Sequence, residues 1–282
     1  GNIRKIFRSW VLIYGHLGME GRGLIGAGLS TMICRILMAL VMMGICFFSK
    51  KYKEYRKGWH QGQTNRRDFR QITVLGFPLA LQMGMETAAF SLSSLMVGWF
   101  GTTALAAHQV MLTISQLGYM IYYGLAAAVA VRISNFMGQR DYTAVRRTAT
   151  AGIHLVFFLA MLTSVPIFIF RHSMGALFTD NTEVISMVSM TIVPFMIYQF
   201  GDGMQCNYAN AMRGIAVVKP LIWIAFIAFF IVSLPLGYLF GVVMNFQLLG
   251  IWYAFPFGLT TAGILYYVYY QKGLKRIEES AK

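Results

Sequence analysis

Between Gly76 and Arg132 the chain runs for 55 residues with a single charged side chain, the carboxylate of Glu86. A helix needs roughly 20 apolar residues to cross the hydrocarbon core of a bilayer, so this stretch is long enough for two crossings. A second stretch, Pro220 to Gln271, holds 52 residues without one Asp, Glu, Lys or Arg. No run shows the ten-residue alternation of a membrane β-barrel. We therefore expect an all-α, polytopic transmembrane helical bundle.

The overall composition supports this class. Charged residues make up 12% of the chain, whereas soluble domains carry about a quarter. The net charge of +14 comes from basic residues that lie between the apolar runs, which is the pattern of cytoplasmic loops and argues against nucleic-acid binding. The three cysteines lie inside apolar runs, and no His or Cys spacing predicts a metal site. The first residue is not Met, so we expect a fragment of a longer protein.

The loops set the predicted topology. The segment Ser49–Arg70 carries eight basic residues and is expected to be cytoplasmic. A further basic segment at 272–282 is expected to be a cytoplasmic tail, and residues 1–15 to hold the end of a truncated helix. The predicted spans cover residues 24–48, about 71–100, about 108–137, 148–170 and 184–212, with two more inside 220–271 that are separated near residues 245–247.

Only two of the ten acidic residues fall well inside predicted spans, Glu86 and Asp202. Each follows a proline by eight positions, Pro78 and Pro194, and so lies about two turns beyond a bend. An ionisable residue inside the membrane marks an ion or substrate path by default. We expect the two acids to meet in a polar cavity between helices.

Polar neighbours share the helix faces of the two acids. They stand three or four positions away, at spacings that place side chains on one face: Gln82, Tyr198 and Gln205. Carboxylate, amide and hydroxyl oxygens suit a hard cation such as Na⁺, and a buried acid pair also suits a proton. Tyr119, Tyr122 and Tyr123 on the adjacent predicted span could present aromatic faces to an organic cation.

Structural alternatives exist for each of these residues. A lone membrane carboxylate can be a satisfied structural group, and tyrosines often form core or interface belts. Arg132 and Arg213 are interpreted as anchors near cytoplasmic helix ends, and His108 as a capping or packing residue.

Several motifs resemble the second half of the multidrug and toxic compound extrusion (MATE) transporters, in particular the NorM-like branch. They include Gly76-Phe-Pro78, Leu105-Ala-Ala-His-Gln109 and Tyr198-Gln-Phe-Gly-Asp202, followed by Ala211-Met-Arg-Gly214. Glu86, Gly124-Leu125, Arg132 and Gly138 also fit that pattern. The resemblance runs from about Trp10 to the C-terminus.

The resemblance implies part of a two-lobe, twelve-helix fold. Residues 1–48 would then end the N-terminal lobe, 49–70 would link the lobes, 71–271 would form the six-helix C-terminal lobe, and 272–282 the tail. It also implies a monomeric antiporter in the bacterial plasma membrane that exchanges Na⁺ or H⁺ for lipophilic organic cations, with Glu86, Tyr198 and Asp202 as the coupling-cation site. Apart from the coupling ion, no cofactor is implied. The expected partners are small organic cations and the lipid of the membrane.

Other functions remain as alternatives. A lipid-linked oligosaccharide flippase of related architecture would need a cationic cavity for pyrophosphate, whereas the charges at mid-depth in these predicted spans are acidic. An enzyme would need a nucleophile with its base, or a metal constellation, and no such spacing is found. The sequence therefore predicts a transporter without catalytic residues.

Overall fold

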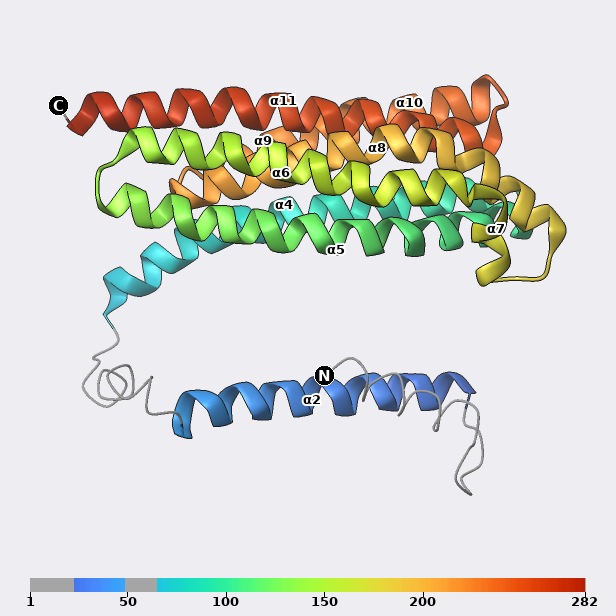
Figure 1. The fold of residues 1–282 in the computed structure, drawn as a ribbon, viewed down its shortest axis with the longest axis horizontal. Helices are drawn as coiled ribbons and strands as arrows, with labels where there is room; N and C mark the ends of the chain where they lie inside the picture. The colour runs from blue at the N-terminus through green and yellow to red at the C-terminus, as the bar shows by residue number, and fades with distance from the viewer. Residues whose placement is uncertain (1–22, 49–64, 282) are drawn as a thin grey trace. The chain divides into compact units, whose positions relative to one another are not determined.

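The computed structural model describes residues 23–48 and 65–281 (Figure 1). The chain divides into two compact units, Gly1–Phe69 and Arg70–Lys282. In the first unit the described residues are 65–69 and helix α2, Gly23–Phe48, whose apolar side chains from Met32 onward are mostly exposed. The predicted truncated helix in residues 1–15 and most of the predicted linking loop 49–70 lie outside the described residues.

The second unit is a bundle of long helices that lie side by side (Figure 1). From α9 (Lys219–Ala225) to η4 (Leu239–Val243) the chain continues without a break as one span, in which η3 (Phe226–Ser233) and η4 have π-helical geometry. No strand occurs in the ranges that the structure describes, and the all-α prediction is confirmed. The elements are α4 (Arg66–Gly98), α5 (Thr102–Gly138), α6 (Tyr142–Ile169), α7 (Arg171–Met174), η2 (Gly175–Leu177), α8 (Thr182–Gly214), α9 (Lys219–Ala225), η3 (Phe226–Ser233), α10 (Leu234–Tyr238), η4 (Leu239–Val243) and α11 (Gln247–Ala281).

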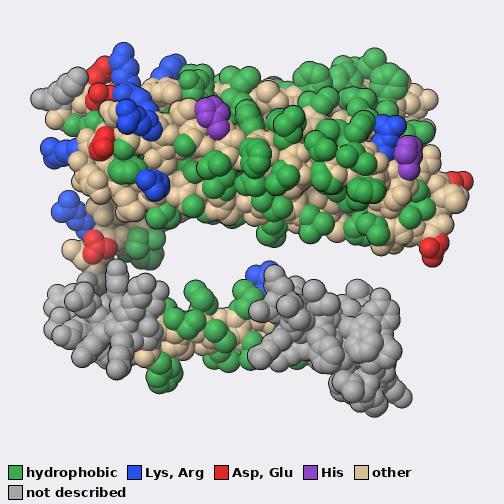
Figure 2. Space-filling view, in the orientation of Figure 1, with side chains coloured by type: hydrophobic (Ala, Val, Ile, Leu, Met, Phe, Trp, Pro, Cys, Tyr) green, Lys and Arg blue, Asp and Glu red, His purple; other side chains and the backbone are tan. Residues whose placement is uncertain are grey.

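Five helices in the described part of the chain are long and apolar enough to cross a membrane: α5, α6, α8, the span Lys219–Val243, and α11. Helix α4 has 33 residues, but glutamines, serines and Glu86 make it less apolar. Large hydrophobic side chains cover the visible face of the bundle, and Lys and Arg gather at the end that carries the C-terminus (Figure 2). The chain is a multi-pass membrane protein.

The helices begin earlier than the hydropathy of their sequences indicates. Helix α4 begins at Arg66 and not near Gln71, because the Asn65 side chain accepts a hydrogen bond from the Arg67 amide at 3.2 Å. Helix α6 begins at Tyr142 and not at residue 148, because Asp141 caps it through the Ala144 amide at 2.9 Å. Hydropathy detects the part of a helix inside hydrocarbon, whereas capping residues set its end in the polar region.

Helices α5 and α8 terminate with the same backbone geometry at the basic end of the bundle. After α5, Arg140 has φ 58° and the Asp141 amide donates to the Phe136 carbonyl at 3.0 Å. After α8, Ala216 has φ 58° and the Val217 amide donates to the Met212 carbonyl at 3.0 Å. Both ends are Schellman motifs, although neither carries the glycine that this left-handed position favours.

Helix α8 lies at the centre of the bundle, with nineteen buried residues among its 33. It packs against α5, α6 and α11. One apolar cluster surrounds Phe195, Phe229 and Trp252, and a second surrounds Ile133 and Tyr266. The two clusters hold the central helices together on either side of the polar site described below.

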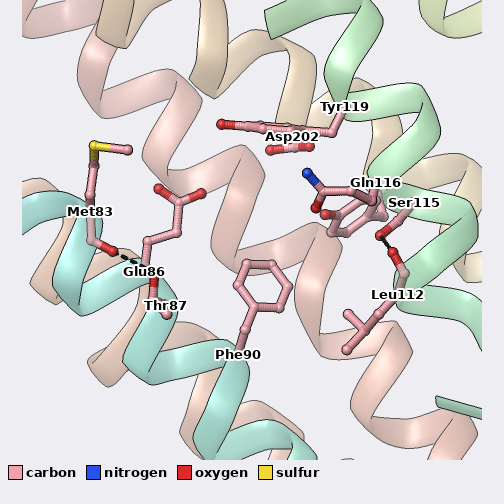
Figure 3. A pocket seen from close by; sticks show the side chains of 10 residues that line it. Met83, Glu86, Thr87, Phe90, Leu112, Ser115, Gln116, Tyr119 and Asp202 are labelled. Carbon is pink, nitrogen blue, oxygen red and sulfur yellow. Dashed lines mark hydrogen bonds between the residues drawn. The ribbon is translucent and has the colours of Figure 1, made fainter. Parts of the chain in front are cut away.

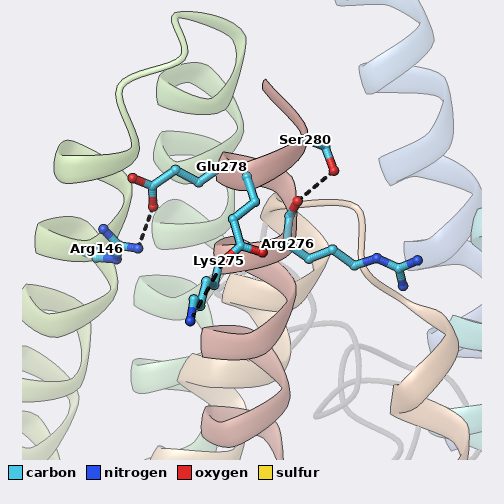
Figure 4. A network of polar contacts seen from close by, with 6 residues as sticks. Arg146, Lys275, Arg276, Glu278 and Ser280 are labelled. Carbon is cyan, nitrogen blue, oxygen red and sulfur yellow. Dashed lines mark hydrogen bonds and ion pairs between the residues drawn. The ribbon is translucent and has the colours of Figure 1, made fainter. Parts of the chain in front are cut away.

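Helix α11 makes two further contacts, one with η4 and one with α6. Gly250 lies against the backbone of η4, where an added Cβ would stand 2.5 Å from the carbonyl carbon and oxygen of Phe240. At the basic end, Glu278 forms an ion pair with Arg146 of α6, with 2.7 Å between Oε2 and Nη2 (Figure 4). Residues 272–281, predicted as a tail, continue α11 as helix, and Lys275 and Glu279 form an i,i+4 pair within it.

Candidate functional site

Glu86 on α4 and Asp202 on α8 line one cavity of about 330 Å³. Figure 3 shows the two carboxylates pointing into the same space from different helices. Proline lies inside both helices, at Pro78 and Pro194, as the sequence predicted. The full lining is Met83, Glu86, Thr87, Phe90, Leu112, Ser115, Gln116, Tyr119, Tyr198 and Asp202.

Asp202 is held by a neighbouring helix. Its side chain is 2% exposed, and the Tyr122 hydroxyl of α5 donates a hydrogen bond to Oδ2. Tyr122 is 1% exposed and is absent from the cavity lining, so it supports the carboxylate from behind. A hydrogen bond to a charged group contributes about 1.5–3 kcal/mol, which fixes the orientation of the carboxylate. The second oxygen remains available to the cavity.

Glu86 is supported from α8. The side-chain amide of Gln205 donates to Glu86 Oε1 at 3.2 Å, and Gln205 is itself 4% exposed. The Gln205 carbonyl oxygen is buried and has no partner among the described residues. Gln205, predicted to line the cavity, is not among its lining residues; it lies beside Glu86 with a side-chain acceptor left unpaired by the described residues.

Gln82 lies on the same α4 face as Glu86 but does not line the cavity. Its Oε1 accepts a hydrogen bond from Arg213 Nη2 at 3.1 Å, and Arg213 Nη1 donates to Asn210 Oδ1 at 3.4 Å. Arg213, interpreted from the sequence as an anchor, is thus bound inside the bundle to side chains of α4 and α8. It places a positive charge one helical turn of α4 away from Glu86.

Aromatic side chains form one wall of the site. Tyr198 is 5% exposed and lines the cavity, where its ring stacks with Phe195 at 5.9 Å between centroids. Tyr119 also lines the cavity and stacks with Tyr123 at 5.2 Å. Of the tyrosines predicted to line the cavity, Tyr119 does so, whereas Tyr122 lies behind Asp202.

Helix α4 presents a stripe of residues four positions apart to the rest of the bundle. Gln82 binds Arg213, Glu86 binds Gln205, and the Phe90 ring contacts Phe255 at 5.2 Å between centroids. At the next step, Ser94 Oγ lies 3.0 Å from His108 Nε2. The four side chains lie on one face because four residues make slightly more than one turn. We call Gln82, Glu86, Phe90 and Ser94 the α4 stripe.

His108 does not line the cavity; both of its ring nitrogens form hydrogen bonds with neighbouring side chains. Trp252 Nε1 donates to His108 Nδ1 at 3.1 Å, which leaves Nε2 to donate to Ser94, whose hydroxyl donates to the Phe90 carbonyl at 3.0 Å. One neutral tautomer satisfies every member of this chain. This chain of hydrogen bonds connects α11, α5 and α4, and it agrees with the packing role that the sequence indicated for His108.

The structure brings Glu86, Tyr198 and Asp202 together around one cavity, with Gln205 bonded to Glu86. Ser115 and Gln116 of α5 are two of the lining residues that sequence reasoning missed. Their positions three and four residues before Tyr119 were the available signal, because that spacing shares a helix face. The oxygens of these carboxylates, hydroxyls and amides can bind a hard cation.

Comparison with known proteins gives a consistent result. The family model MatE matches residues 78–239. The NorM multidrug resistance protein of Aliivibrio fischeri is 32% identical over 263 residues, which cover 91% of this chain and 57% of that protein. The NorM protein of Photobacterium profundum is 28% identical and covers 94% and 59%. The chain thus spans somewhat more than half the length of these relatives.

Solved structures share the fold. The crystal structure of the eukaryotic MATE transporter AtDTX14 superposes with a TM-score of 0.84 at 18% identity, over 99% of this chain and 63% of that one. An outward-facing multidrug resistance MATE family transporter of the MOP superfamily gives 0.84 at 16% identity, over 98% and 60%.

Proposed function

The chain belongs to the MatE family, and from that premise we propose that it is part of a multidrug exporter driven by Na⁺ or H⁺. Its match covers 57% of the length of the Aliivibrio fischeri relative, so the activity of a whole transporter is part of this proposal. The carrying observation is that Glu86 and Asp202, on separate helices, line one cavity.

In the proposed mechanism the coupling cation binds between these two carboxylates. Two like charges facing one cavity of low dielectric repel each other, and a proton or Na⁺ removes that repulsion. Tyr198 and Ser115 add hydroxyl oxygens to the lining, and Tyr122 holds Asp202 from behind. The resident cation would be bound by oxygen ligands alone, which suits Na⁺ as well as a proton.

The proposed cargo is a lipophilic organic cation that uses the same acids. A positive charge on the drug would face Glu86 and Asp202, while its apolar part would contact Phe90 and Tyr119. Cargo and coupling cation then compete for one site, and each opposes the binding of the other by an equal factor. The relatives carry the description multidrug resistance protein, and the acidic lining would repel pyrophosphate, so the flippase alternative is not favoured.

The test is efflux of ethidium from vesicles that contain the full-length protein, with a Na⁺ gradient and a pH gradient imposed separately. We expect Glu86→Gln and Asp202→Asn each to lower gradient-driven efflux at least about tenfold, since each removes a charge from the cavity. Matched controls are Glu183→Gln and Asp180→Asn, which remove the same groups at the far end of α8. Normal efflux by both cavity variants would refute the assignment.

A further inference from the structure

We propose that the groove between α5 and α6, near the basic end of the bundle, binds an anionic phospholipid of the cytoplasmic leaflet, with its phosphodiester on Arg132 and Arg147 and one acyl chain along the apolar wall. This groove is a cavity of about 390 Å³, separate in its lining from the acidic cavity. The inference does not depend on the proposed transport activity.

The two arginines stand on facing helices and are available to an anion. Both are exposed, and both line the groove. Arg147 forms no hydrogen bond or ion pair with the residues that the structure describes. Within the described part of the chain, the Arg132 guanidinium contacts the Phe136 ring, at 5.3 Å from the ring centroid. By contrast Arg146, the neighbour of Arg147, is already paired with Glu278.

The depth of the arginines matches the headgroup region. From Arg147 to Ile169, the last residue of α6, there are 22 steps, or about 33 Å at 1.5 Å per residue. That is close to the roughly 30 Å thickness of the hydrocarbon core. From Thr102 to Arg132 there are 30 steps, or about 45 Å, which is close to the full bilayer thickness with its headgroups. Both side chains therefore reach the layer where lipid phosphates lie.

The wall of the groove becomes apolar toward the bilayer centre. Arg147, Ala151 and Leu155 follow one another at four-residue spacing on α6, and Leu125 lies seven positions before Arg132 on α5. Leu125 and Leu155 are thus about 10–12 Å deeper than the arginines. Small side chains at the middle of the groove, such as Ala151, leave room between the two helices.

The two arginines and the apolar wall of the groove together indicate which class of ligand it binds. A free anion would use the arginines and leave the apolar wall bare, whereas a zwitterionic phospholipid would bring the cation of its headgroup against the two guanidinium groups. Arginine forms paired hydrogen bonds with phosphate oxygens, and basic pockets between transmembrane helices on the cytoplasmic side suit anionic lipid heads. An anionic phospholipid satisfies both ends of the groove at once.

The experiment measures lipid binding to the purified full-length protein by native mass spectrometry. Phosphatidylglycerol and phosphatidylcholine of equal chain length are the two lipid probes, and inorganic phosphate is a competitor. Each basic residue near an anionic lipid contributes about fivefold in affinity, so we expect Arg132→Gln with Arg147→Gln to weaken phosphatidylglycerol binding about 30-fold. The unaltered protein should bind phosphatidylcholine, whose phosphodiester is accompanied by a choline cation, more weakly than phosphatidylglycerol, and inorganic phosphate should compete poorly.

Two controls separate the groove from general surface charge. Arg140→Gln removes the same charge from the α5–α6 turn, outside the groove, and should leave phosphatidylglycerol affinity unchanged. Ala128→Phe fills the groove while both arginines stay, and should also weaken phosphatidylglycerol binding. Equal loss in Arg140→Gln, retained affinity in the double variant or in Ala128→Phe, or full competition by phosphate would each overturn the proposal.

Discussion

Replacement of Gly250 by alanine should destabilise the bundle by forcing η4 away from α11. The added Cβ would stand 2.5 Å from the Phe240 carbonyl atoms and 2.6 Å from the Gly241 nitrogen, whereas ordinary contact begins at 3.4 Å. The helices must therefore separate by about 0.9 Å (3.4 minus 2.5), because backbone atoms cannot rotate out of the way. A gap of that size removes a quarter to a half of the dispersion energy of neighbouring contacts.

The expected cost follows from two opposing effects. Overpacking costs about 1–3 kcal/mol, and the contacts of the fully buried Trp252 and of Ile251 are lengthened at the same time. Alanine recovers about 1 kcal/mol of helix propensity relative to glycine. We expect a net loss of up to about 2 kcal/mol in the free energy of unfolding, and a melting temperature lower by up to about 8 °C.

Gly237→Ala is the matched control, since Gly237 of α10 is also buried and faces α11 from the same span, Lys219–Val243. Its added Cβ would meet Ala254 Cβ at 3.8 Å and Met96 Cε at 3.9 Å, which are ordinary contacts. This variant should be unchanged or more stable by up to about 1 kcal/mol. The assay is thermal unfolding of the full-length protein in detergent, followed by tryptophan fluorescence. If Gly250→Ala melts at or above Gly237→Ala, the close approach of η4 and α11 is wrong.

Three smaller changes test other contacts by the same melting assay. Ala216→Gly should raise stability by about 0.5–1 kcal/mol, because glycine adopts φ 58° without the Cβ strain of alanine. Glu278→Gln should change stability by less than about 1 kcal/mol, because its pair with Arg146 is 43% and 27% exposed on the two side chains. Trp252→Phe should cost about 1–3 kcal/mol, because it leaves the buried Nδ1 of His108 without its donor.

Each of these outcomes can contradict the structure. A lower melting temperature in Ala216→Gly would mean that α8 does not end in the left-handed geometry described above. A loss of several kcal/mol in Glu278→Gln would mean that the pair is desolvated in the membrane-bound protein. For Trp252→Phe the control is Trp223→Phe, which changes a 69% exposed indole and should have little effect.

The sequence was sufficient to predict the class and most of the spans. Long uncharged runs predict membrane helices because backbone groups in lipid must be paired within the segment. The break predicted near residues 245–247 lies close to the observed one, because η4 ends at Val243 and α11 begins at Gln247. What hydropathy could not indicate was the π-helical geometry of η3 and η4, because it depends on how the span packs and not on its composition.

The candidate site was predicted in part. Glu86 and Asp202 stood out because intramembrane acids are rare, and their meeting follows from the antiparallel run of α4 and α8. The partners of Gln82 were not predictable, because Arg213 lies 131 positions along the chain and its side chain turns inward only in the packed bundle. The place of Tyr122 behind Asp202 likewise depends on the rotation of α5, which sequence spacing alone does not determine.

The α4 stripe has a consequence for how the bundle would respond to an arriving ion. Helices α4 and α8 have the same length, yet α4 buries six residues where α8 buries nineteen. Helix α4 therefore depends on a small number of side-chain contacts with the rest of the bundle, and the hydrogen bond between Glu86 and Gln205 is one of them. A cation that takes over the Glu86 carboxylate exchanges a bond between helices for a bond to itself. Binding of the ion would therefore change how firmly the whole of α4 is attached to α8.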